Sequence, residues 1–86
     1  MPESSEESVL LPVALHARPA GALVRAVAAF DATVEILFGE KAANARGVLG
    51  LLALGAPAGS TVVIRAEGVE ATAAVKAAAE VLAAAD

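Results

Sequence analysis

The sequence contains no cysteine, no tryptophan and no tyrosine, and its only aromatic residues are two phenylalanines. Without cysteine the chain forms no disulfide and carries out no thiolate chemistry, which fits a reducing, cytoplasmic compartment. Without tyrosine and tryptophan it lacks side chains on which nucleic-acid bases stack. Basic residues are also few, because six lysines and arginines are outnumbered by ten acidic residues, for a net charge of −4. We therefore expect no nucleic-acid partner.

Long uninterrupted hydrophobic runs are absent too, although 58% of the residues are hydrophobic. The longest charge-free run, Gly47 to Ile64, contains glycine, proline, serine and threonine and divides into a helical half and a strand half. Because a membrane-spanning helix needs about 20 apolar residues in succession, we expect no membrane insertion. The first eight residues lack the basic start of a secretory signal. We expect residues 1–6 to be frayed and residues 1–86 to form a single domain.

Hydrophobic periodicity predicts alternating strands and helices. Thr33–Phe38 alternates as a strand does, and Gly39-Glu40 predicts a hairpin turn after it. The residues Leu23, Val27 and Phe30 recur at helical spacing, with Arg25 outside their stripe and therefore solvated. The predicted elements are a strand from residue 7 or 8 to 11, a helix over 17–30, strands over 33–38 and 41–44, a helix over 46–54, a strand over 60–66 and a helix over 70–84. This βαββαβα order predicts an α+β fold.

The short predicted helix that ends at Gly55 is apolar on more than one face. Such a helix cannot bury all its leucines against one sheet, and an exposed apolar patch indicates a docking surface. We expect Leu51 and Leu54 in the core and Leu49 and Leu52 at least partly exposed. The alternative is that all four leucines fill the core of a small domain.

The stretch Leu15-His16-Ala17-Arg18-Pro19-Ala20 holds the only histidine, at the junction of an extended run and a helix. With His16 as N-cap, the amides of Ala17 and Arg18 have no intrahelical partner, and a helix N-terminus of this kind attracts anions. Arg18 adds a guanidinium that suits phosphate, and a neutral imidazole is a competent nucleophile. The stretch therefore indicates a site at which His16 carries a phosphoryl group. The alternative is a surface histidine at a helix start.

The hexapeptide resembles the active-site motif of HPr, the histidine-containing phosphocarrier family of the bacterial sugar phosphotransferase system. Pro12, Ala43-Asn44-Ala45-Arg46-Gly47-Val48-Leu49-Gly50, Leu54-Gly55 and Ala66-Glu67-Gly68 are similar to further segments of the same family. The resemblance extends from about Val9 to Leu82. It implies four antiparallel strands covered on one face by three helices, an open-faced β-sandwich.

The resemblance also implies a mechanism. His16 would accept a phosphoryl group on Nδ1 from phospho-Enzyme I and pass it to a sugar-specific EIIA acceptor domain. The backbone amides of Ala17 and Arg18 and the Arg18 side chain would stabilise the phosphate. The resemblance further implies that the protein is a cytoplasmic monomer. It would be a carrier rather than an enzyme, and it would use neither cofactor nor metal. The docking surface carried over from the family comprises Ala20, Gly21, Arg46, Val48, Leu49 and Leu52, where Arg46 either steers an acidic partner or is merely solvated.

Two positions depart from the family pattern. HPr commonly has serine where this chain has Gly47, so a regulatory serine is absent there. HPr usually has asparagine or serine three residues before the histidine, where this chain has Val13, which cannot hydrogen-bond the imidazole. These departures favour a paralogue over the main sugar-uptake HPr.

Other functions remain open from the sequence. A paralogue could serve nitrogen regulation or dihydroxyacetone phosphorylation, and a non-carrying regulatory module could use the same docking face. A hydrolytic or metal enzyme is a third class, disfavoured because a single histidine without cysteine offers few metal ligands. Ser60 also lacks a second histidine to activate it.

Overall fold

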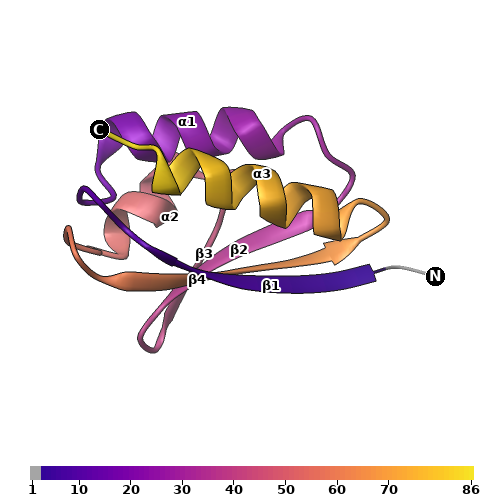
Figure 1. Ribbon diagram of the computed structural model, residues 1–86, viewed down its shortest axis with the longest axis horizontal. Helices are drawn as coiled ribbons and strands as arrows, with labels where there is room; N and C mark the ends of the chain where they lie inside the picture. Colours follow the sequence, from indigo (N-terminus) through magenta and orange to yellow (C-terminus); the bar gives the residue numbers. More distant parts are fainter. Residues whose placement is uncertain (1–2) are drawn as a thin grey trace.

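The computed structural model describes residues 3–86, which form a four-stranded antiparallel sheet with three helices on one face (Figure 1). The elements are β1 (Glu3–Leu10), α1 (Ala17–Val27), β2 (Thr33–Phe38), β3 (Lys41–Asn44), α2 (Val48–Ala53), β4 (Thr61–Gly68) and α3 (Ala71–Ala83). The strand order is β1-β4-β2-β3, so β1 and β3 are the edges. The predicted α+β fold, an open-faced β-sandwich of βαββαβα order, is confirmed.

The core lies between the sheet and the helices. Alternate residues of the two central strands, such as Val34, Ile36 and Ile64, point to the helices and are fully buried. The helices contribute Leu23, Val27, Leu51 and Leu82, together with the alanines on the inner face of α3. Each buried leucine or isoleucine contributes about 1.5–3 kcal/mol, so burial of these few side chains holds the layers together.

The other face of the sheet carries polar side chains and is solvent-exposed. Arg65 on β4 donates a hydrogen bond to Glu35 Oε1 on β2 at 3.0 Å. This bond and the attraction of Glu35 raise the pKa of the Arg65 guanidinium. Opposite charges on neighbouring strands support the register, as cross-strand pairs commonly do.

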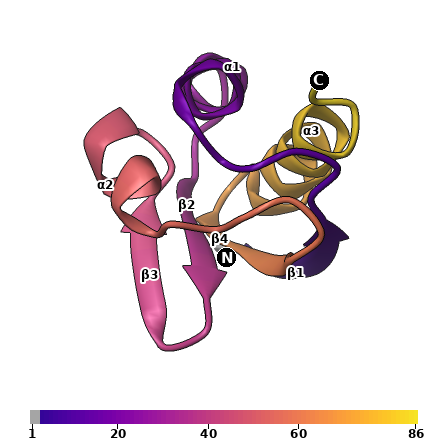
Figure 2. The ribbon, with the colours of Figure 1, turned by 90° about the vertical axis from the view of Figure 1, so that its left-hand side faces the viewer.

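The three helices are spread across the width of the sheet. Helix α3 packs on β1 and β4, α2 packs beside β3, and α1 lies between these two helices (Figure 2). The loop before α1 is therefore at the same end of the molecule as the loop after α2. Within residues 3–86, none of the helices has the length and apolar character needed to traverse a lipid bilayer.

The predicted frayed start is wrong for residues 3–6. Strand β1 begins at Glu3 and pairs with β4 along its whole length, from Glu3 opposite Gly68 to Leu10 opposite Thr61. The Glu3 carboxylate also accepts a hydrogen bond from the Thr72 amide at 3.4 Å. Main-chain pairing thus stabilises an acidic segment whose composition alone gives no strand signal. Met1 and Pro2 lie outside the described residues.

Helix boundaries differ from the sequence prediction at two places. Helix α1 ends at Val27 rather than Phe30, whose amide bonds the Val27 carbonyl in a tighter turn. Helix α2 begins at Val48 rather than Arg46, because the Asn44 side chain and carbonyl hold residues 44–47 in a turn. The predicted strands 33–38 and 41–44 are confirmed without change. The other ends agree within two residues.

Candidate functional site

His16 occupies the N-cap position of α1, as the sequence predicts. Its backbone is extended, with φ −100° and ψ −164°, and its carbonyl accepts the first helical hydrogen bond, from Ala20 at 3.0 Å. The preceding residue, Leu15, is buried and donates its amide to the Ala56 carbonyl at 2.9 Å. Leu15 therefore anchors the loop, while the next side chain, the imidazole of His16, is exposed and makes no hydrogen bond with residues 3–86.

The first turn of α1 presents two backbone donors to solvent. The amides of Ala17 and Arg18 donate no hydrogen bond within residues 3–86, and Pro19 has no N–H to donate. Pro19 is itself buried, so its ring holds the first turn against the core. The positive end of the helix dipole and these two donors lie beside the imidazole. A dianionic group attached to His16 would find unoccupied donors next to it.

Arg18 is exposed and follows His16 by two residues. It lines a hollow of about 180 Å³ together with Val81 of the last turn of α3 and with Ala84 and Asp86, which follow that helix. Within the described residues its guanidinium forms neither an ion pair nor a hydrogen bond. Arg18 is thus available to bind an anion on His16 without first breaking an interaction of the fold.

Arg46 has a different role from the one expected at the sequence level. Its guanidinium Nη2 donates to the carbonyls of Phe30 at 2.9 Å and Ala32 at 3.0 Å. These carbonyls follow the C-terminal end of α1, and the 11 residues of that helix span about 16 Å. Arg46 therefore lies at the opposite end of α1 from His16 and holds the α1–β2 loop. Arg46 is thus not merely solvated, and the alternative that its exposed charge steers an acidic partner stays a prediction.

The predicted docking residues divide into buried and exposed ones. Ala20 has no exposed surface, so the expectation that it contacts a partner is wrong; it fills the space between α1 and the sheet. Leu49 on α2 is 82% exposed, and Val48 and Leu52 are half-buried beside it. Gly21 on α1 is also half-buried. The expected division of the leucines, with Leu51 and Leu54 in the core and Leu49 and Leu52 at least partly exposed, is confirmed.

The end of α2 comes close to the histidine loop. Ala56, two residues beyond the helix cap Leu54, accepts the hydrogen bond from Leu15. Gly55 makes the turn between them with φ +65°, a conformation that glycine adopts without strain. The end of α2 and the N-terminus of α1 are consequently adjacent, and we call the exposed residues of these two helices the α1–α2 surface.

Arg25 was missed as a member of this surface. A Cβ built on Gly21 would lie 3.5 Å from Arg25 Nη1, so the Arg25 guanidinium extends back over Gly21. The i, i+4 spacing of these residues on a helix was the available signal. Arg25 is exposed and adds a second positive charge to α1. Because its guanidinium lies beside Gly21, this charge is one helical turn closer to His16 than the Cα atom of Arg25 is.

The two departures from the HPr pattern have different structural settings. Val13 is half-buried, and its side chain offers the imidazole no hydrogen-bonding atom. Gly47 is exposed at the N-cap of α2, with a negative φ of −118°. A Cβ there would meet nothing closer than the Asn44 carbonyl at 3.8 Å. The backbone at position 47 therefore has room for the side chain of a serine, so the absence of a serine there is not imposed by sterics.

Comparisons with known proteins agree on one family. The family model described as the PTS HPr component phosphorylation site matches residues 4–84. A phosphocarrier protein HPr of Lysinibacillus sphaericus is 35% identical over 66 residues, 77% of this chain and 75% of that protein. A multiphosphoryl transfer protein of Xanthomonas campestris pv. campestris is 36% identical over 74 residues, 86% of this chain, which spans only 9% of that much longer protein. The crystal structure of HPr from Bacillus anthracis superimposes with a TM-score of 0.84 and 31% identity, covering 92% of this chain and 96% of that one.

Proposed function

The chain belongs to the HPr family of phosphocarrier proteins of the phosphotransferase system, and we propose that His16 is the residue that carries the phosphoryl group. In this proposal Nδ1 of His16 receives the group from phospho-Enzyme I and passes it to an EIIA-type acceptor domain. The single observation that carries the proposal is the exposed imidazole beside two backbone amides and an arginine, none of which has a hydrogen-bond partner within residues 3–86. The protein acts as a carrier, a monomeric domain in the cytoplasm.

The transfer needs little from this chain besides position and charge. Phosphoryl transfer is catalysed mainly by alignment of donor and acceptor and by stabilisation of charge. As the bond between phosphorus and the donor nitrogen breaks, the bond to Nδ1 of His16 forms in line with it. The amides of Ala17 and Arg18 and the Arg18 guanidinium then hold the phosphoryl oxygens. Leu15, fixed by its bond to Ala56, keeps the N-cap residue at the surface where a partner reaches it.

The α1–α2 surface is the proposed docking site for both donor and acceptor. Leu49, Leu52 and Val48 supply exposed apolar area next to the histidine loop. Arg18 and Arg25 supply positive charge on a chain whose net charge is negative. Apolar contacts at the centre with charge at the margin are typical of transient interfaces and favour acidic partners. Because donor and acceptor both need access to His16, they would use this surface in turn.

A pathway other than sugar uptake is the second candidate, favoured by Val13 and Gly47. Because Val13 has no hydrogen-bonding side chain, position 13 does not orient the imidazole in this protein. With no hydroxyl at position 47, this protein would not be regulated there. Both features fit a paralogue in nitrogen regulation or in dihydroxyacetone phosphorylation. The relative in Xanthomonas is named a multiphosphoryl transfer protein, so an HPr-like segment also occurs within a longer phosphotransfer protein.

Intact mass spectrometry tests the proposal. Wild type and His16→Ala are incubated with Enzyme I from the same organism and phosphoenolpyruvate. We expect one added phosphoryl group on wild type, lost on brief acid treatment as a phosphohistidine is, and none on the variant. Because His16 is the only histidine, an acid-labile group has no other imidazole to occupy. Circular dichroism of His16→Ala should show a native fold, since the imidazole makes no contact that holds the loop.

Three outcomes would contradict this assignment. Equal modification of His16→Ala would move the site elsewhere. An unfolded variant would make His16 structural. An unmodified wild type that still binds Enzyme I would identify a regulatory module that uses the docking surface without carrying phosphate.

A further inference from the structure

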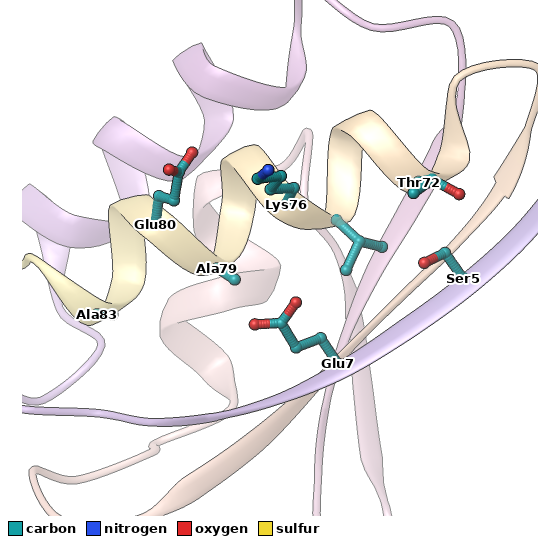
Figure 3. Close-up of a pocket in the computed structure, with 8 residues that line it drawn as sticks. Ser5, Glu7, Thr72, Lys76, Ala79, Glu80 and Ala83 are labelled. Carbon is teal, nitrogen blue, oxygen red and sulfur yellow. The ribbon is translucent and has the colours of Figure 1, made fainter.

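A second surface lies on the opposite flank of the molecule, between β1 and α3. An open groove of about 440 Å³ runs along the inner side of the edge strand. Its lining consists of Ser5 and Glu7 from β1 and of Thr72, Val75, Lys76, Ala79, Glu80 and Ala83 from α3 (Figure 3). The floor is formed by the small apolar side chains of α3, and the rim is polar. Alanine at positions 79 and 83 leaves the space that a larger side chain would fill.

One edge of β1 has no partner strand within residues 3–86. In an antiparallel ladder, successive residues direct their N–H and C=O groups alternately to either side of the strand. The amide and carbonyl of Leu11 bond Ser60 and Gly59 on the β4 side. Counting back by twos, Val9 and Glu7 also face β4, whereas Ser4, Glu6, Ser8 and Leu10 direct their main-chain groups outward. An eight-residue strand thus offers a row of donors and acceptors to an added strand.

The charge at this edge is negative. Strand β1 carries three glutamates and no basic residue. The Glu7 carboxylate projects into the groove toward α3 (Figure 3), and within the described residues it forms no ion pair. Lys76 lines the same groove but lies beyond 4 Å from every carboxylate of residues 3–86. Glu7 is therefore an exposed carboxylate without an ion-pair partner within residues 3–86, and it lies in a groove beside a strand edge that has no neighbouring strand.

We propose that this edge and groove bind an extended, lysine- or arginine-rich segment of a partner protein as a fifth strand. Its main chain pairs with the outward groups of Ser4, Glu6 and Ser8. Its side chains alternate between the two faces of the sheet. Those on the helix side enter the groove, where a long basic side chain lies over Ala79 and reaches the Glu7 carboxylate. Those on the open face meet Glu6.

The negative charge of β1 disfavours two other occupants of the groove, a second copy of this chain and an apolar strand. A second copy that paired β1 with β1 would bring glutamates from both chains together, and like charges on neighbouring strands are destabilising. An apolar strand would bury the Glu7 carboxylate without a partner, which costs free energy. A basic strand relieves both penalties, so the sign of the charge selects the partner.

The groove is separate from the α1–α2 surface. Helix α3 and β1 lie at one side of the molecule, α2 and β3 lie at the other, and α1 lies between them (Figure 2). A segment bound along β1 leaves Leu49 and Leu52 exposed to a phosphotransfer partner. The groove would thus attach the protein to a second component while His16 continues to exchange its phosphoryl group. This inference is independent of the role proposed for His16.

Amide NMR titration of the full chain tests it, with three blocked eight-residue peptides. The first alternates lysine with threonine, the second has glutamate in place of lysine, and the third is the lysine peptide with alternate amides N-methylated. We expect the lysine peptide to shift the amides of Ser4, Glu6 and Ser8 and to slow their hydrogen exchange. The other two peptides should bind at least about tenfold more weakly, because one loses the charge and the other the main-chain bonds.

Variants of the protein sharpen the test. Glu7→Gln should weaken binding of the lysine peptide about fivefold, the scale of one exposed ion pair, and Glu7→Lys should reverse the preference toward the glutamate peptide. Glu40→Gln, an exposed glutamate at the β2–β3 turn, is the matched control and should change nothing. Equal binding of the N-methylated peptide, shifts confined to α1 and α2, or no shift at millimolar peptide would overturn the proposal. Self-association through β1, detected by sedimentation analysis, would overturn the proposal and identify a second copy of this chain as the occupant of the groove.

Discussion

Replacing Arg46 with alanine should destabilise the protein without slowing its chemistry. The two hydrogen bonds from Arg46 Nη2 to the carbonyls of Phe30 and Ala32 hold the loop between α1 and β2. Charge-assisted bonds contribute about 1.5–3 kcal/mol when shielded from water, and one of these two is exposed and the other half-buried. We therefore expect Arg46→Ala to lower the free energy of unfolding by about 1–2 kcal/mol in total. For a domain of this size, that corresponds to a fall in Tm of about 5–10 °C.

The assay pairs thermal unfolding with the rate of phosphoryl transfer from Enzyme I at a temperature where every variant is folded. Arg46→Lys is the informative companion, because a lysine keeps the charge on a shorter side chain, whose ammonium does not reach the position from which Nη2 bonds both carbonyls. Both variants should lose stability and keep the transfer rate. A Tm within about 2 °C of wild type together with a several-fold slower transfer would refute the reasoning, since Arg46 would then act on a partner.

Four further variants test other parts of the structure. Arg18→Ala should slow transfer about tenfold with unchanged Tm, because its guanidinium forms no ion pair or hydrogen bond within residues 3–86; an unchanged rate in stopped-flow would remove it from the site. Leu49→Ala should weaken binding to Enzyme I about tenfold by calorimetry and leave stability unaltered, and the opposite pattern would make the leucine structural. Gly68→Ala should cost about 2 kcal/mol or more in denaturant titration, since φ is +135° and a Cβ would lie 2.9 Å from the Ala32 Cα; a wild-type midpoint would show that the turn relaxes freely. Gly47→Ser should raise the free energy of unfolding by a few tenths of a kcal/mol, because serine caps a helix better than glycine, whereas a lower Tm would indicate crowding.

The sequence predicted those elements in which the pattern of apolar and polar residues directly reflects what is buried and what is exposed in the fold. Val34 and Ile36 alternate with polar residues, so the strand that contains them was found at its true bounds. Gly39 with φ +60° makes the turn that its position in the sequence indicates. The start of α1 was also predicted, because His16 and Pro19 occupy the N-cap and first turn, where proline is tolerated. The same local logic places His16 and Arg18 together in the candidate site.

Long-range contacts decided the features that the sequence did not predict. Strand β1 looks polar because its inward positions Ser5 and Glu7 face a groove rather than the core, and only pairing with β4 makes it a strand. Helix α1 stops early because the residues after it are held by Arg46 from one side and Glu70 from the other. The position of Arg46 in a predicted helix gave no indication of partners 14 and 16 residues earlier in the chain.

The solvent-exposed position of the α1 N-terminus sets how firmly a phosphoryl group would be held. An anion at an exposed helix end gains only about 0.3–1 kcal/mol from the dipole. Such a gain changes an equilibrium constant about fivefold at most. The helix dipole by itself would therefore lower the group-transfer potential of a phosphohistidine at position 16 only slightly. A carrier that holds its phosphoryl group this loosely could release it to an acceptor that reaches His16, so the relative amounts of charged donor and uncharged acceptor would influence the direction of flow through this protein.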